Sequence, residues 1–116
     1  MVIRLLQVRT HEFNSAVCSA IEDTIRECLG EWALYDSLFT LETQYDISRD
    51  ELPYRIDTLY RILETKHQVV GANTMAPLIA QKMYRKLGLS FYPNDGYTLR
   101  DYVKDAKLKL AKQPSN

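Results

Sequence analysis

The sequence predicts an all-α fold, a compact bundle of about five short amphipathic helices that forms a single domain over residues 1–116. Apolar residues recur along most of the chain at spacings of three and four, which is the period of a helix with one buried face. Only four glycines and four prolines interrupt the chain, so long stretches can remain helical. A length of 116 residues is typical of one domain.

The first predicted helix begins at Asn14 or Ser15, which are both good N-cap residues, and ends before Gly30. Its apolar residues lie three, four and three positions apart, at Cys18, Ile21, Ile25 and Cys28. Both cysteines are therefore expected in the core as small hydrophobic side chains. Their separation of about 15 Å along one helix excludes a disulfide between them. Residues 1–13 are predicted to form an N-terminal arm.

The second predicted helix spans residues 31–45 and is apolar over much of its circumference. One apolar row consists of Leu34, Leu38, Leu41 and Tyr45, and a second row consists of Trp32, Tyr35 and Phe39. So wide an apolar face needs either two neighbouring helices or one neighbour and a partner chain. Because aromatic side chains are enriched at protein interfaces, the second row is the candidate protein interface, and the chain is expected to form a homodimer.

Capping signals predict the start of a third helix. Ser48 and Glu51 have the spacing of a capping box, and Pro53 is tolerated in a first turn. A helix is therefore expected to begin near Ser48 or Pro53 and to run to about Lys66, followed by a connection that ends at Gly71.

The fourth predicted helix carries a basic surface. Thr74 can cap this helix, Pro77 fits its first turn and Gly88 ends it. Its exposed side holds Lys82, Arg85 and Lys86. Together with a small hairpin over residues 89–99, this basic face would resemble the recognition helix and wing of a nucleic-acid-binding protein.

A fifth helix competes with that hairpin for the same stretch of chain. Thr98 and Asp101 have the spacing of a capping pattern, which favours a helix that continues through Leu110. The helix is the preferred prediction. Residues 112–116 are expected to form a frayed tail.

The charge distribution divides the chain into an acidic and a basic part. Fifteen basic and fifteen acidic residues give no net charge, so no overall field attracts nucleic acid or an anionic membrane. Residues 12–51 hold ten acids and two bases, whereas residues 52–116 hold eleven bases and five acids. These parts are expected to attract each other within the fold, and attraction between two copies in a dimer is the alternative.

No residue pattern indicates catalysis, a cofactor or a metal site. His11 and His67 are the two histidines, and neither has a further ligand at metal-binding spacing. No glycine-rich loop follows a strand pattern, so a signature of nucleotide binding is missing. Arg4 interrupts the apolar N-terminus, and no run approaches the roughly 20 apolar residues of a membrane span. A cytoplasmic, non-enzymatic protein is therefore expected.

Six short motifs between residues 16 and 89 carry a family resemblance. They are LGE at 29–31, LETQYDI at 41–47, DELP at 50–53, LYRILE at 59–64, GA at 71–72 and IAQKMYRKLGL at 79–89. The chain in this region resembles the Nitrosopumilus output domains of the fifth type, small archaeal helical domains of unknown function. The resemblance implies a helical cytoplasmic module downstream in signalling, with no known active residues.

The expected function follows from these observations. A non-enzymatic domain that acts through protein contacts, and that self-associates through Trp32, Tyr35 and Phe39, is the first hypothesis. A nucleic-acid-binding regulator that uses the basic face of the fourth helix is the alternative.

Overall fold

The structure, a computed structural model, describes the backbone of residues 2–112 and the side chains of residues 10–112. Over that backbone the chain forms five α-helices, two short 3-10 helices and no strand, which confirms the all-α prediction. The elements are α1 (Val2–Leu29), α2 (Glu31–Tyr45), η1 (Arg49–Tyr54), α3 (Ile56–Lys66), η2 (Ala72–Met75), α4 (Ala76–Lys86) and α5 (Leu99–Lys112). Apart from Lys112, the predicted frayed tail lies outside the described residues.

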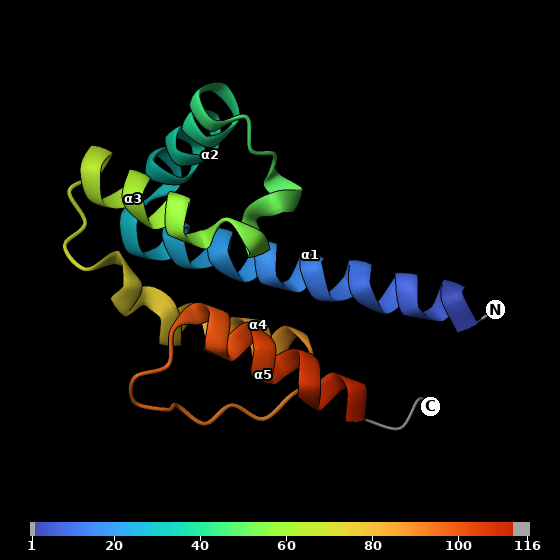
Figure 1. The fold of residues 1–116 in the computed structure, drawn as a ribbon. Coiled ribbons are helices and arrows are strands. Elements are labelled where there is room, and N and C mark those ends of the chain that lie inside the picture. The colour runs from blue at the N-terminus through green and yellow to red at the C-terminus, as the bar shows by residue number, and fades with distance from the viewer. Residues whose placement is uncertain (1, 113–116) are drawn as a thin grey trace.

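The long helix α1 is the central element of the molecule (Figure 1). α2, η1 and α3 lie on one side of it, and α4 and α5 lie on the other. α1 packs directly against α2, η1 and α4, whereas α5 packs against α4. Val17, Ala20 and Ile21 of α1 have no exposed surface. One hydrophobic core therefore passes through the molecule, with α1 joining its two sides.

α1 begins at Val2, so its predicted start at Asn14 or Ser15 is wrong. Residues 1–13, which were expected to form an arm, contain no glycine or proline that would interrupt a helix. Phe13 is 4% exposed, so the buried stripe of the helix continues across the predicted boundary. A residue that can cap a helix starts one only where the preceding backbone leaves the helical conformation.

Both cysteines are free, but only Cys18 lies in the core. Cys18 is 2% exposed, and burial raises the pKa of its thiol. Cys28 is exposed, so its predicted place in the core is wrong. In the last turn of α1 its neighbour Leu29 packs against the core instead.

α2 has the bounds that the sequence predicts, but the buried side of the helix differs from the predicted row. Leu34 and Leu41 are buried as expected, whereas Leu38 is only partly buried and Tyr45 is 43% exposed. The remaining buried positions of α2 hold small side chains, which are Ala33, Ser37 and Thr40. Small side chains allow neighbouring helices to approach closely. The larger aromatic row is left on the opposite side of α2.

The predicted capping box is present, but it starts η1 rather than an α-helix. The Ser48 amide donates a hydrogen bond to Glu51 Oε1 at 3.2 Å. Pro53 lies inside η1, and α3 begins only at Ile56. The cap therefore starts a 3-10 helix of six residues, about two turns long, and only Arg55 separates it from α3.

The start of α4 also differs in detail from the prediction. Thr74 lies within η2, where its hydroxyl donates to the Gly71 carbonyl at 2.7 Å, so it does not cap α4. Pro77 lies in the first turn of α4 as predicted. Gly88 follows the helix with φ at 71°, a conformation that glycine adopts without strain.

The hairpin predicted as an alternative over residues 89–99 is wrong, because none of these residues is in a strand. Thr98 and Asp101 instead cap α5. The Thr98 amide donates to Asp101 Oδ2 at 2.9 Å, and the Asp101 amide donates to Thr98 Oγ1 at 3.2 Å. The Tyr102 hydroxyl accepts a hydrogen bond from the backbone amide of Asn94 at 3.1 Å and donates one to the backbone carbonyl of Asn94 at 3.2 Å. These bonds hold the loop without a strand ladder.

Candidate protein-interaction surface

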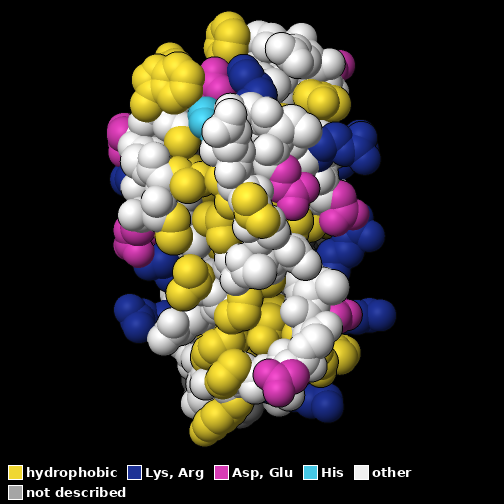
Figure 2. All heavy atoms as spheres, turned by 90° about the vertical axis from the view of Figure 1, so that its left-hand side faces the viewer, with side chains coloured by type: hydrophobic (Ala, Val, Ile, Leu, Met, Phe, Trp, Pro, Cys, Tyr) yellow, Lys and Arg dark blue, Asp and Glu magenta, His cyan; other side chains and the backbone are white. Residues whose placement is uncertain are grey.

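Trp32, Tyr35 and Phe39 form an uncovered patch on α2, which we call the aromatic face. Their exposed fractions are 71%, 75% and 58%. Spacings of three and four residues place them on the same side of the helix. Figure 2 shows large hydrophobic side chains standing out at the top of the molecule, the end at which α2 lies. No described part of the chain covers this row of side chains.

The C-terminal end of α3 braces one edge of the aromatic face. The Trp32 and His67 rings meet edge to face, with 5.7 Å between their centroids. His67 Nε2 lies 2.9 Å from Asp36 Oδ2, and Lys66 Nζ lies 3.2 Å from the same oxygen. Lys66 also donates to Thr40 Oγ1 at 2.9 Å. These contacts tie α2 to α3 and hold the helix beneath the aromatic side chains.

α2 contributes only acidic charges to this surface, because it contains no lysine or arginine. Glu31 Oε2 lies 2.7 Å from Arg26 Nε, and Asp36 is paired with α3 as described above. Glu42 is exposed and has no partner among the described residues. The aromatic face therefore has an acidic edge with one unpaired carboxylate.

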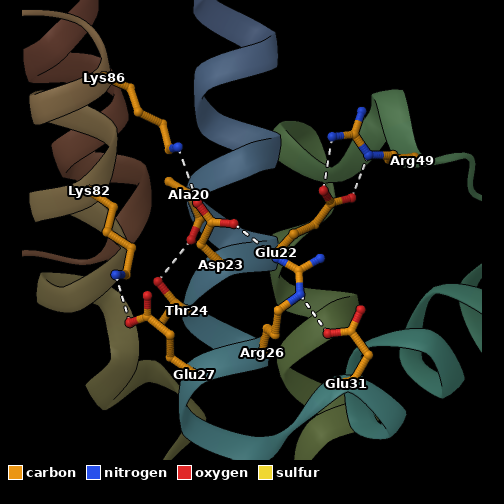
Figure 3. A network of polar contacts seen from close by, with 10 residues as sticks. All are labelled: Ala20, Glu22, Asp23, Thr24, Arg26, Glu27, Glu31, Arg49, Lys82 and Lys86. Atoms are coloured by element: carbon orange, nitrogen blue, oxygen red, sulfur yellow. Dashed lines mark hydrogen bonds and ion pairs between the residues drawn. The ribbon is translucent and has the colours of Figure 1, made fainter.

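The predicted basic face of α4 is largely occupied by contacts within the molecule. Lys82 Nζ lies 2.7 Å from Glu27 Oε2, and Lys86 Nζ lies 3.1 Å from Asp23 Oδ2 (Figure 3). Arg85 is exposed and has no ion-pair partner among the described residues. Two of the three cations thus face acids of α1, and the loop after α4 supplies no wing. The geometry offers little support for binding nucleic acid through this face.

The two basic residues of the acidic part, Arg26 and Arg49, also form ion pairs in this region. Glu22 of α1 holds the Arg49 guanidinium, with 2.9 Å between Arg49 Nη2 and Glu22 Oε1 (Figure 3). Arg26 pairs with Asp23 at 3.1 Å. The ion pairs that join the acidic part to the basic part are Glu27 with Lys82, Asp23 with Lys86 and Asp36 with Lys66, so the two parts meet within the fold.

Acid should weaken the ion pairs of Asp23 with Lys86 and Arg26, and replacing Asp23 should remove that part of the acid dependence of stability. The hydrogen bond from Lys86, reinforced by the charges of Lys86 and Arg26, lowers the pKa of the Asp23 carboxyl. A carboxyl whose pKa is lowered by folding stabilises the fold at every pH above its ordinary pKa of about 3.9. That stabilisation is lost as the pH falls through the lowered pKa. Asp23→Asn should therefore reduce the free energy of unfolding at pH 7 by about 0.2–1 kcal/mol.

Urea denaturation at pH 7 and at pH 2 measures this effect. The difference between the two pH values should be smaller in Asp23→Asn than in the unchanged protein. Asp95→Asn is the matched control, because Asp95 is exposed and has no ion-pair partner among the described residues. If both variants show the full acid dependence of the original chain, the Asp23 ion pair does not contribute to it.

A groove between α1 and α5 is a second surface, which the sequence did not indicate. It has a volume of about 940 Å³ and is lined by α1 between residues 10 and 19 and by α5 between residues 107 and 111. Lys86 and Leu87, at the C-terminal end of α4, complete the lining. The groove depends on how α1 and α5 lie relative to each other, and neither helix signals that placement in its own sequence.

The two histidines have different surroundings. His67 is held by Asp36 next to the aromatic face, and His11 lies in the lining of the groove. Among the residues with described side chains, no three His, Cys, Asp or Glu residues gather closely enough to hold a metal ion. None of the described helices combines the length and apolar character that a membrane span requires.

The resemblance to the Nitrosopumilus output domains remains a prediction. No family model, no curated protein and no solved structure matches the chain.

Proposed function

We propose that this chain is a non-enzymatic helical module that acts through protein contacts and self-associates through the aromatic face, as a homodimer. The observation that carries the proposal is the exposure of Trp32, Tyr35 and Phe39, each more than half exposed on one side of α2. A cytoplasmic location belongs to the same proposal and is supported by two free cysteines. A role in signalling rests on the family resemblance alone.

The size of the aromatic face is adequate for an interface. A fully buried aromatic side chain removes about 150–250 Å² from water. Because these three are 58–75% exposed, roughly 300–500 Å² of their surface remains to be buried. Standard protein interfaces bury about 800 Å² on each partner. Contiguous apolar patches of roughly 300–600 Å² on monomers are often functional. The aromatic face could therefore supply most of the buried centre of an interface.

The rigidity of the aromatic face also favours binding. Tyr and Trp side chains have only two rotatable bonds, so they bury area at a low cost in conformational entropy. The underlying helix is fixed by the contacts of Asp36 with Lys66 and His67. Preorganised surfaces of this kind lose less free energy on association.

Replacing Trp32, Tyr35 and Phe39 together by alanine tests the proposal. We expect the unchanged chain to have the mass of a dimer in light scattering at micromolar concentration, and the triple variant to have the mass of a monomer. Aromatic hot spots contribute about 2 kcal/mol or more each, so the dissociation constant should rise at least 100-fold. Because all three side chains point to solvent, the helical content measured by circular dichroism should stay unchanged.

The matched control replaces exposed residues that lie outside α2. Tyr92 is 72% exposed and Val70 is 96% exposed, and Tyr92→Ala/Val70→Ala should keep the mass of the unchanged protein. A monomeric mass for the unchanged chain up to 100 micromolar, or a dimer that survives the triple substitution, would overturn the proposal.

A further inference from the structure

We infer that the aromatic face receives a partner segment that is rich in arginine. The inference rests on the proposed function, because it uses the same surface, and it adds the chemistry of a second partner. The segment competes with a second copy of the chain for Trp32, Tyr35 and Phe39.

Two exposed carboxylates continue the row of aromatic side chains along α2. Glu42 lies seven residues after Tyr35, and Asp46, the residue directly after the helix, lies seven residues after Phe39. Seven residues are about two helical turns, so each carboxylate lies close to the side of the helix that carries the aromatic rings. The step from Phe39 to Glu42 is about 4.5 Å along the helix axis. A ligand that lies on the rings can therefore reach these acids.

The surface around the aromatic rings keeps a net negative charge. The two cations next to the aromatic face are already paired with acids, Arg26 with Glu31 at 2.7 Å and Lys66 with Asp36 at 3.2 Å. These pairs cancel their own charges. The two carboxylates beyond Phe39 form no ion pair with a described side chain. The charge that remains beside the rings therefore complements a cationic partner.

The C-terminal end of α2 adds to this negative charge. The last turn of the helix contains no basic residue, although cations are favoured there because the final backbone carbonyls carry partial negative charge. Asp46 instead places a carboxylate at the negative end of the helix dipole. The helix end and the two carboxylates therefore attract a cation from the same direction.

Arginine suits both parts of this surface. Its planar guanidinium stacks on aromatic rings and is attracted to their faces. The same group donates two parallel hydrogen bonds to a carboxylate. Lysine is more strongly hydrated and has no planar face, so it gains less from the rings. A segment with several arginines can place one guanidinium on Tyr35 or Phe39 and another on Glu42.

Titration with a short peptide tests the inference. The probe is a blocked peptide of four Arg-Ala repeats, and its uncharged counterpart has citrulline in place of arginine. Trp32 is the only tryptophan of the chain, so a change in its fluorescence places the peptide at the aromatic face. At low salt the arginine peptide should saturate this change below 1 millimolar, and the citrulline peptide should bind about tenfold more weakly. Added salt should weaken the binding of the arginine peptide.

Glu42→Gln/Asp46→Asn removes the two carboxylates and keeps the rings. Asp46 has φ at 54°, a conformation that asparagine also adopts, so the end of α2 should keep its shape. The dissociation constant of the arginine peptide, measured by calorimetry, should rise about three- to thirtyfold, as expected for the loss of two exposed ion pairs. Glu12→Gln/Asp95→Asn is the matched control, with the same change in net charge at exposed residues outside α2, and it should leave this constant within about twofold.

Light scattering on the same samples separates this inference from the proposed function. If the chain is a dimer, the arginine peptide should convert it to monomers, because both partners use the same rings. If the chain is a monomer and binds the arginine peptide as expected, self-association fails and this inference stands. The inference is overturned, whatever the mass of the chain, if Trp32 fluorescence shows no saturating response, if the citrulline peptide binds equally well, or if the two double variants bind alike. A dimer that persists at saturating peptide overturns it as well and leaves the proposed function standing.

Discussion

Replacing Tyr102 by alanine should lower the free energy of unfolding by about 3–5 kcal/mol, the range found when a buried aromatic side chain is removed. Tyr102 is 1% exposed. Its ring centroid lies 6.4 Å from that of Tyr84, 5.5 Å from that of Phe91 and 5.1 Å from that of Tyr97. The substitution opens a cavity among these rings and removes both hydrogen bonds to Asn94. Two effects therefore add at one position.

Two further variants separate these effects in urea denaturation. Tyr102→Phe keeps the ring and loses only the hydroxyl, so it should cost about 1–3 kcal/mol. Tyr92 lies in the same loop and is 72% exposed, so Tyr92→Ala should change stability by about 0.5 kcal/mol or less. A cost for Tyr102→Ala within 1 kcal/mol of the Tyr92→Ala value would show that the loop is not held by this residue.

Removing two hydroxyl groups should make the protein more stable. Ser37 Oγ and the Tyr60 hydroxyl are buried and have no hydrogen-bond partner in the described part of the chain. Burial without a partner costs about 1–3 kcal/mol for each group. The same burial raises the pKa of Tyr60. Ser37→Ala/Tyr60→Phe should therefore raise the free energy of unfolding by about 2 kcal/mol or more, since alanine is also the better helix former in α2.

Thermal unfolding measures this gain. For a domain of this size each kcal/mol shifts the midpoint by about 4 °C, so an increase of roughly 8 °C is expected for the double variant. Ser90→Ala/Tyr92→Phe is the control, because both residues are exposed, and it should leave the midpoint within about 2 °C. A double variant that melts at or below the original midpoint would mean that the two hydroxyls are satisfied in solution.

The sequence predicted helix ends well where glycine or a charged cap fixed the backbone. α2 has its predicted bounds because Gly30 precedes it with φ at 97° and Asp46 follows it in the left-handed conformation. The Thr98 and Asp101 pair correctly favoured α5 over a hairpin. The start of α1 was missed because a residue such as Asn14 can cap a helix or lie inside one, and only the backbone before it decides between the two.

The candidate surface was predictable in part. Periodicity placed Trp32, Tyr35 and Phe39 on one side of α2, but it could not indicate which of two apolar rows faces the core. That choice was made by Ser37 and Thr40, whose small polar side chains do not contribute to a hydrophobic pattern although both are buried. The groove could not be predicted at all, because it arises between helices that are distant in sequence.

The central place of α1 also has a kinetic consequence. Lys82 of α4 meets Glu27 of α1 across 55 residues, and closing a loop of that length costs about 3.5 kcal/mol in chain entropy. α1 and α2 adjoin along the chain, so their pairing avoids most of this cost. The packing of α4 against α1 is therefore expected to be the slower step of folding. The carboxylates of α1 attract the lysines of α4 before contact, so the division of charge along the chain should speed that search.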